Sequence, residues 1–176
     1  MMPREIVHRG RRIAVAIDES VGPNGEVIRR DMIFHPGAVV VLPIIDREQI
    51  CLLRNYRFVI EETLWEIPAG TLEPGEVLEA AARRELEEES GYTAATMTAK
   101  GFFYASPGVL DEKLHLFFAE GLTAGTARPE VDEQLEPVVL RLDDAVAMIL
   151  AGEIRDAKTI TAILLYERTL RCAPIV

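Results

Sequence analysis

The sequence predicts a single α/β (α+β) fold in which short strands, many of them antiparallel, combine with a few helices. Apolar runs of strand length dominate the first third of the chain, and helical spacing appears only later. The early runs have connections of hairpin length, which favours antiparallel or mixed pairing. With 176 residues, 49% of them apolar, the chain is long enough for one sizeable core.

Strands are expected first along the chain. The predicted strands of this part are residues 12–17, 26–34, 37–45 and 49–54. The first two are joined by a turn-forming cluster at 22–25, and the last two are expected to form a hairpin. Because a lone hairpin is marginal in water, residues 1–36 should pack as an N-terminal β region on the body or on a second chain. Residues 37–176 would then form the main domain.

The first clear helix is predicted over residues 76–90. Pro74 and Gly75 break the chain before it, and Gly91 is well placed as a left-handed residue after it. The remaining predicted elements are strands over 97–103, 113–119 and 138–142 and helices over 142–151 and 157–170. Asp143 or Asp144 is expected to cap the first of these two helices.

Composition excludes several function classes. A net charge of −10 argues against a protein that grips nucleic-acid backbones, although a small phosphorylated substrate remains compatible with a local metal or arginine. No apolar run reaches membrane-spanning length and no signal peptide is evident, so we expect no membrane partner. Cys51 and Cys172 form no disulfide framework or metal spacing, which favours a reducing, cytoplasmic location.

An acidic cluster ends the helix predicted at 76–90. Glu85, Glu88 and Glu89 are related by i, i+3 and i, i+4, so their carboxylates lie on one side of the helix. Like charges repel there, and the helix dipole disfavours anions near its C-terminus. A solvated face is one interpretation; the other is a site for a hard, oxygen-binding cation such as Mg²⁺. The adjacent apolar stripe and the strand-like run 64–70 before it favour the metal.

The residues of this segment match a long family pattern. Counted from Gly70, the pattern continues with Glu76, Arg84, Glu85, Leu86, Glu88, Glu89 and Gly91. The segment resembles the Nudix box, from which it departs only at Tyr92, where an aliphatic residue is usual. The resemblance implies a Nudix fold, with a mixed β-sheet sandwiched between α-helices and an N-terminal antiparallel β-hairpin region. It also implies metal-dependent hydrolysis of a nucleoside diphosphate linked to another group.

The same resemblance implies roles for individual residues. It suggests Mg²⁺, or else Mn²⁺, as the cofactor, and the metal ligands that it implies are Glu85, Glu88, Glu89 and the backbone carbonyl of Ala69. Arg84 matches an arginine that pairs with a glutamate of the box, here Glu76. Arg84 and Glu89 are therefore also expected to be catalytic.

Features outside the box are similar to the ADP-ribose pyrophosphatase branch of the family. They are the segment 54–57 followed by 65–70, Pro107 placed 15 positions after Tyr92, and an acidic loop at 132–136. This likeness implies hydrolysis of ADP-ribose to AMP and ribose 5-phosphate. It also implies a homodimer, since the N-terminal strands of this branch often exchange between two subunits. The alternatives are hydrolysis of another nucleotide sugar such as GDP-mannose, removal of oxidised nucleoside triphosphates, and a non-catalytic nucleotide-binding regulator.

The general base and the substrate contacts come from the flanks of the box. Glu133 is the first candidate for the base and Glu136 the second, with solvated loop acids as the alternative. Guanidinium groups bind phosphate oxygens in a bidentate manner, although any one arginine can also be a surface charge. The candidate substrate-binding residues are Arg30, Arg54, Arg57, Glu66 and Pro107. Phe34 and Tyr56 are candidates to stack on the adenine.

Overall fold

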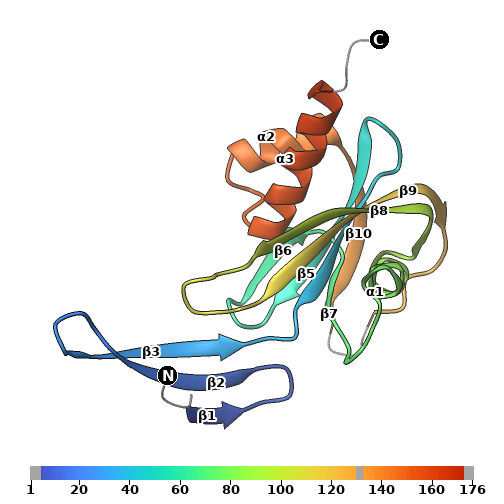
Figure 1. Cartoon of the computed structure of the whole chain (residues 1–176). Helices are drawn as coiled ribbons and strands as arrows, with labels where there is room; N and C mark the ends of the chain where they lie inside the picture. The colour runs from blue at the N-terminus through green and yellow to red at the C-terminus, as the bar shows by residue number, and fades with distance from the viewer. Residues whose placement is uncertain (1–4, 130–132, 173–176) are drawn as a thin grey trace.

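The computed structural model describes residues 5–129 and 133–172 (Figure 1). A four-stranded mixed sheet lies at its centre in the order β7-β4-β9-β8. The strands are β4 (Ala38–Pro43), β7 (Ala69–Thr71), β8 (Tyr92–Tyr104) and β9 (Lys113–Ala124). β4 and β9 are parallel, and the other neighbours are antiparallel. The predicted mixed sheet is therefore confirmed.

A second antiparallel sheet has the order β10-β5-β6. Its strands are β5 (Gln49–Arg57), β6 (Glu62–Glu66) and β10 (Leu135–Arg141). The hairpin predicted from 37–45 and 49–54 is limited to its turn, where Ile44 bridges Ile50 and the Ile45 N–H donates to the Gln49 carbonyl at 2.9 Å. Its extension into a paired ladder is wrong, because β4 and β5 belong to different sheets. Both strands are buried almost throughout, so their apolar runs look alike although their hydrogen-bonding partners differ.

Helices cover both faces of the central sheet (Figure 1). Val39 and Val41 of β4 pack against α1 (Leu78–Glu85) and the turn after it. Val40 and Leu42, which alternate with them, face the core on the side of α2 (Leu142–Leu150) and α3 (Ala157–Cys172). This period of two is the reason that one strand supports helices on both faces. Within the described residues, no helix is both long and apolar enough to cross a membrane.

Two details at helix starts differ from the predictions: α1 begins at Leu78 rather than at residue 76, and no aspartate is in the cap position of α2. The helix expected over 76–90 is α1 followed by a short π-helix, η1 (Leu86–Ser90), and Gly91 ends it with a φ of 76°, the left-handed conformation expected there. The prediction that Asp143 or Asp144 caps α2 is wrong. The helix begins at Leu142 with Arg141 in the cap position, so both aspartates lie in its first turn. Their charges still favour the helix N-terminus there.

The N-terminal region forms its own antiparallel sheet of three strands rather than the predicted two. The strands are β1 (Glu5–Arg9), β2 (Ala14–Val21) and β3 (Val27–Phe34), in that order. The sheet stands beside the body, and the end of β3 joins it to the loop between β8 and β9 (Figure 1). There the Ile33 N–H donates to the Val109 carbonyl at 2.8 Å, and the Asp111 N–H donates to the Ile33 carbonyl at 3.1 Å.

Candidate active site

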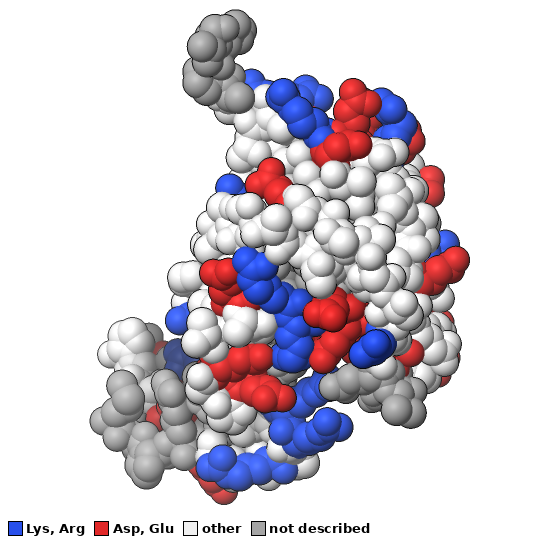
Figure 2. Space-filling model, turned by 90° about the vertical axis from the view of Figure 1, so that its right-hand side faces the viewer, with Lys and Arg blue, Asp and Glu red and all other residues white. Residues whose placement is uncertain are grey.

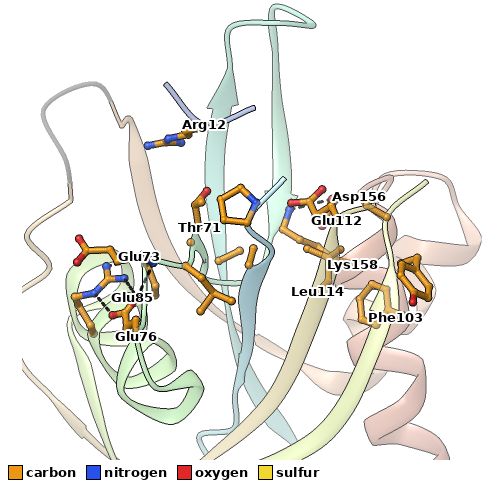
Figure 3. Close-up of a pocket in the computed structure, with 18 of the residues that line it drawn as sticks. Arg12, Thr71, Glu73, Glu76, Glu85, Phe103, Glu112, Leu114, Asp156 and Lys158 are labelled. Atoms are coloured by element: carbon orange, nitrogen blue, oxygen red, sulfur yellow. Dashed lines mark hydrogen bonds and ion pairs between the residues drawn. The ribbon is translucent and has the colours of Figure 1, made fainter. Parts of the chain in front are cut away.

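Arg84 of α1 holds three glutamates together. Its Nε and Nη2 donate to the two carboxylate oxygens of Glu76 at 3.1 and 3.2 Å. Its Nη1 donates to Glu85 at 2.7 Å and to Glu88 at 3.1 Å. The expected pair of Arg84 with Glu76 is thus present, and it lowers the pKa of the Glu76 carboxyl below its ordinary value. This two-point contact of Arg84, here called the arginine fork, fixes the loop before α1 against the helix. Figure 3 shows Glu76 and Glu85 close together at this end of the cavity.

Glu85 lies against the backbone of β7. A Cβ built on Gly70 would overlap the Glu85 carboxylate, so the absence of a side chain at Gly70 makes room for that group. Burial raises the pKa of Glu85, and the nearby charge of Arg84 opposes this shift. The Glu85 carboxylate, which is partly desolvated, therefore lies directly against Gly70, the residue that follows Ala69.

Glu89 is the most deeply buried member of the acidic cluster, with 4% of its surface exposed. The Ala69 N–H donates to its Oε2 at 3.0 Å. Burial is the main cause that raises the pKa of Glu89 to about 8; the negative charges of Glu133 and Glu85 act in the same direction, whereas this hydrogen bond and the charge of Arg57 oppose the shift. Glu89 is therefore a buried acid surrounded by like charge.

These residues fit a divalent metal by the chemistry of their donors. Among the described residues, no three acidic, histidine or cysteine side chains form a ready metal cage. Arg84 is paired with Glu85 and Glu88 in this structure. The donor set nevertheless consists of carboxylate oxygens beside a backbone segment, which suits Mg²⁺ or Mn²⁺. The raised pKa of Glu89 shows that its anionic form lacks sufficient compensating charge, and a cation would supply it.

The two candidate general bases occupy different places. Glu133 lines a large pocket that opens beside α1, and its negative charge raises the pKa of both Glu85 and Glu89. Glu136 is exposed on β10, opposite Arg54 in the register, and is not among the described residues lining that pocket. Asp132, at the start of the same predicted acidic loop, lies outside the described residues.

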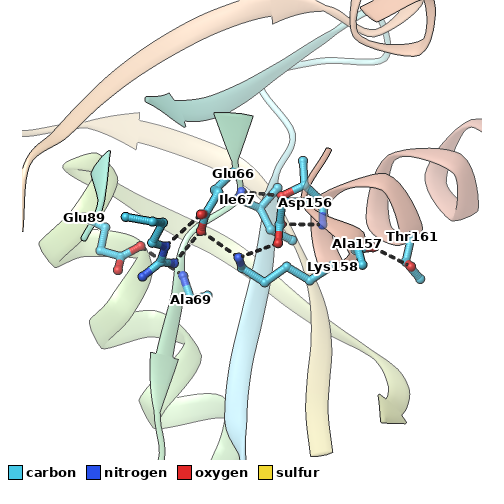
Figure 4. A network of polar contacts seen from close by, with 10 residues as sticks. Glu66, Ile67, Ala69, Glu89, Asp156, Ala157, Lys158 and Thr161 are labelled. Atoms are coloured by element: carbon cyan, nitrogen blue, oxygen red, sulfur yellow. Dashed lines mark hydrogen bonds and ion pairs between the residues drawn. The ribbon is translucent and has the colours of Figure 1, made fainter. Parts of the chain in front are cut away.

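The predicted substrate-binding residues also include some that line this pocket and some that do not. Arg57 lines the pocket, and its Nε donates to Oε1 of the buried Glu66 at 2.8 Å, with Nη2 paired to the second oxygen. Glu66, at the end of β6, is not among the lining residues found; it is buried and bonded to Arg57, and Figure 4 shows it beside Lys158. The structure therefore brings Arg57 to the cavity and places Glu66 as its anchor.

Three other candidates lie away from this cavity. The Arg30 Nη1 donates to the Ser20 Oγ at 2.7 Å within the N-terminal sheet. The Arg54 guanidinium lies over the Trp65 ring at 4.7 Å from its centroid. Pro107 is exposed in the turn after β8. None of the three is among the described residues that line the pocket, so their substrate-binding roles stay predictions without support from geometry.

The pocket has a volume of about 1110 Å³ and extends to both sides of β4 (Figure 3). The side near α1 carries the acidic residues and Arg84, while the side near α3 carries Lys158, Asp156, Phe103 and Tyr104. Arg11 and Arg12 of the N-terminal region also reach the cavity. Figure 2 shows basic and acidic side chains interleaved over the middle of one face. The lining thus combines arginine and lysine side chains with aromatic surface, although the net charge is negative.

Sequence reasoning missed several of these lining residues. Phe34 and Tyr56 were the aromatic candidates, yet Phe103 and Tyr104 are the aromatic residues found in the lining. Lys158 was not selected because it lies 92 positions after its partner Glu66. The only local signal was an aspartate at the start of a predicted helix, which indicates a helix cap but not what the neighbouring lysine contacts.

A mixed sheet between helices, with a glutamate-rich helix end held by an arginine fork, defines a hydrolase of the Nudix type, and the chain belongs to the Nudix family. The family model described as NUDIX domain matches residues 34–163. An ADP-ribose pyrophosphatase of Bacillus subtilis strain 168 is 41% identical over 162 residues, covering 91% of this chain and 88% of the relative. A GDP-mannose pyrophosphatase of Citrobacter koseri is 34% identical, covering 78% of each.

A solved structure gives the same result for the fold. The crystal structure of an ADP compounds hydrolase superimposes with a TM-score of 0.86 and 25% identity, covering 99% of this chain and 95% of that chain. The family and these relatives make the protein an enzyme, a Nudix diphosphatase.

Proposed function

We propose that this enzyme hydrolyses the diphosphate bond of ADP-ribose to AMP and ribose 5-phosphate with Mg²⁺ or Mn²⁺. The observation that carries the proposal is that Glu85 and Glu133 line the pocket and act on the buried Glu89, whose pKa is raised to about 8 by burial first and by these two negative charges second. Such a cluster is costly without a cation, and a cation there would stand beside a cavity large enough for a nucleotide sugar. The similarity to the Bacillus subtilis enzyme supports the choice of ADP-ribose.

Each residue has a distinct role in this proposal. Glu85, Glu88, Glu89 and the Ala69 carbonyl would hold the divalent metal, which supplies Lewis acidity toward the phosphoryl oxygens and lowers the pKa of a bound water. Glu133, on the pocket wall, accepts the proton of the attacking water. Arg84 keeps Glu85 and Glu88 in place.

Arg57 binds the diphosphate in this proposal. Its Nε and Nη2 are fixed on Glu66, so the orientation of the guanidinium is set before the substrate arrives. A planar, preoriented guanidinium binds phosphate oxygens with less loss of entropy than a free side chain does. Glu66 therefore contributes to substrate binding through Arg57.

A panel of nucleoside diphosphate sugars with product identification tests the substrate. With Mg²⁺, we expect ADP-ribose to have the highest kcat/KM and to give AMP and ribose 5-phosphate. GDP-mannose is the second candidate because of the Citrobacter koseri relative. A higher kcat/KM for GDP-mannose would overturn the proposed substrate. Neither the family nor these enzyme relatives favour the non-catalytic regulator.

The choice of general base has its own test. Glu133→Gln should lower kcat by about 10²-fold or more, because it removes the proton acceptor from the pocket wall. Glu136→Gln is the matched control on the exposed face of β10 and should leave kcat within about twofold. Steady-state turnover of ADP-ribose measures both. The reverse ranking would transfer the role of base to Glu136.

We also propose that residues 1–36 form the dimerising region and residues 37–176 the catalytic domain. Support comes from the N-terminal sheet, which stands beside the body and exposes apolar side chains such as Val7, Val21 and Val27. Light scattering of the purified protein should give twice the chain mass of 19.6 kDa. A mass equal to one chain would contradict the homodimer.

A further inference from the structure

A group of four charged side chains, here called the Glu66 network, lies at the wall of the pocket, and three of the four line it. It consists of Arg57, Glu66, Asp156 and Lys158 (Figure 4). Glu66 has 2% of its surface exposed and accepts hydrogen bonds from Arg57 and from the Lys158 Nζ, the latter at 2.6 Å. A carboxylate this deep is costly unless it is paired and hydrogen-bonded. Both cations are therefore needed to keep Glu66 charged.

The two cations of the Glu66 network are exposed to different degrees. The side chain of Arg57 is 45% exposed, whereas that of Lys158 is 12% exposed. Both line the pocket, but the lysine ammonium is bonded to Glu66 and, at 3.0 Å, to the Asp156 Oδ1. Arg57 is thus the more exposed cation, whereas Lys158 is nearly buried and is paired with both carboxylates of the network.

The start of α3 holds Lys158 in place. Asp156 accepts hydrogen bonds from the Thr159 N–H at 3.0 Å and from the Thr159 hydroxyl at 2.6 Å. The same hydroxyl oxygen accepts from the Ile67 N–H at 2.9 Å. Because Ile67 directly follows Glu66, the helix start is fixed to the strand end that carries the carboxylate. This leaves Lys158 and Glu66 little freedom to separate.

We infer that Lys158 is a positioning residue for substrate binding, because it holds Glu66 in the orientation that fixes Arg57 at the pocket. The inference rests on the proposed hydrolysis of a nucleoside diphosphate sugar. Without Lys158, Glu66 and Asp156 would share Arg57 as the one remaining cation of the network, beside a cavity that takes an anion. The freed carboxylate would reorient, and the guanidinium would lose its fixed position.

A double-mutant cycle between Lys158 and Arg57 tests the inference. Lys158→Met, Arg57→Met and the double variant are compared by calorimetric binding of ADP-ribose in EDTA, where no metal-assisted turnover occurs, and by KM and kcat with Mg²⁺. We expect Lys158→Met to weaken binding and raise KM by on the order of tenfold while kcat changes by less than about threefold. In the Arg57→Met background, the same change should have almost no further effect.

Two variants serve as controls. Arg155→Met removes the ion pair with Glu62, which joins the same strand and helix start at the surface, and should leave binding unchanged. Lys158→Arg keeps the charge and should restore most of the affinity. If Lys158→Met does not fold, Lys158→Gln replaces it in the cycle, since it keeps a donor for Glu66 and removes only the charge.

Three results would overturn the inference. The first is that the losses of affinity in Lys158→Met and Arg57→Met multiply in the double variant, as they would for independent residues. The second is that Lys158→Met lowers the melting temperature without any change in binding. The third is that Arg155→Met loses as much binding as Lys158→Met does. Failure of the proposed function would appear separately in the wild-type protein, as GDP-mannose hydrolysed in preference to ADP-ribose. The same cycle would then be measured with GDP-mannose.

Discussion

Glu66 and Glu89 are carboxylates of nearly equal burial, 2% and 4% exposed, but their surroundings shift their pKa values in opposite directions. Burial acts to raise both. At Glu66, Arg57 and Lys158 outweigh that effect and lower the pKa below its ordinary value. At Glu89, one backbone N–H and the more distant charge of Arg57 do not outweigh burial and two neighbouring carboxylates, so the pKa rises to about 8.

The two sites differ in whether cations of the chain balance the negative charge of the buried carboxylate. Glu66 has its cations within the chain, so it acts as a fixed anchor for Arg57. Glu89 lacks such a partner and is suited to receive a cation from solution. Burial alone therefore does not identify a functional acid in this protein; the balance of charge around it does.

The largest expected effect comes from removing the charge of Glu89. Glu89→Gln should lower kcat by about 10²–10³-fold, because the proposed metal site loses its most buried ligand. The folded state should be kept, since a neutral amide suits an apolar environment better than an unbalanced anion. Turnover of ADP-ribose and thermal melting in EDTA measure the two effects. Full activity in this variant would refute the assignment of Glu89 as a metal ligand.

The matching substitution at Glu66 should lower stability, in addition to weakening substrate binding through Arg57. Glu66→Gln leaves Lys158 and Arg57 without their shared anion, and we expect a loss of about 2–4 kcal/mol in the free energy of unfolding. Urea denaturation measures this loss. An unchanged free energy of unfolding would show that the Glu66 network contributes no net stability, and the contrast with Glu89 would then rest on catalysis alone.

The smallest expected effect is on the pH dependence of stability, which should differ between Glu89 and Glu66. Glu89 keeps its proton up to a pH of about 8 in the folded protein, whereas its ordinary pKa is 4.5. In EDTA, the free energy of unfolding should therefore fall by roughly 1–3 kcal/mol as the pH rises across this range. Glu66 has a lowered pKa, so its contribution is lost only as the pH falls below the ordinary value.

Denaturation in EDTA across this pH range checks the prediction. Glu89→Gln serves as the control, because it removes the titrating group and should flatten the decline between pH 5 and 8. Addition of Mg²⁺ should stabilise the wild type more at the alkaline end, where Glu89 binds it without first releasing a proton. An equal slope in the wild type and Glu89→Gln would mean that other groups cause the decline.

The acidic cluster could be predicted from sequence because its geometry is local. Helical spacing brings Glu85, Glu88 and Glu89 together, and the pair of Arg84 with Glu76 spans only eight positions. The mixed sheet between helices was also predicted, from the resemblance of residues 70–92 to the Nudix box. Local rules and one long pattern were sufficient for these features.

The features that sequence could not predict depend on which strands become neighbours. Residues 49–54 were assigned to a hairpin with 37–45, but β5 joins β6 and β10 in another sheet. For the same reason Lys158 was missed, since its contact with Glu66 requires α3 to pack beside the end of β6. Buried apolar strands carry no alternation that identifies their partners, so long-range pairing was not recoverable from their residue types.

Gly70 illustrates a constraint that backbone conformation does not reveal. Its φ lies outside the left-handed range in which glycine is favoured, so the conformation alone would accept alanine. The obstacle is instead the Glu85 carboxylate, which occupies the volume that a methyl group would take. A mutational library would therefore show position 70 as intolerant to its smallest possible change. Engineering guided by backbone angles alone would select that change and displace a proposed ligand of the metal.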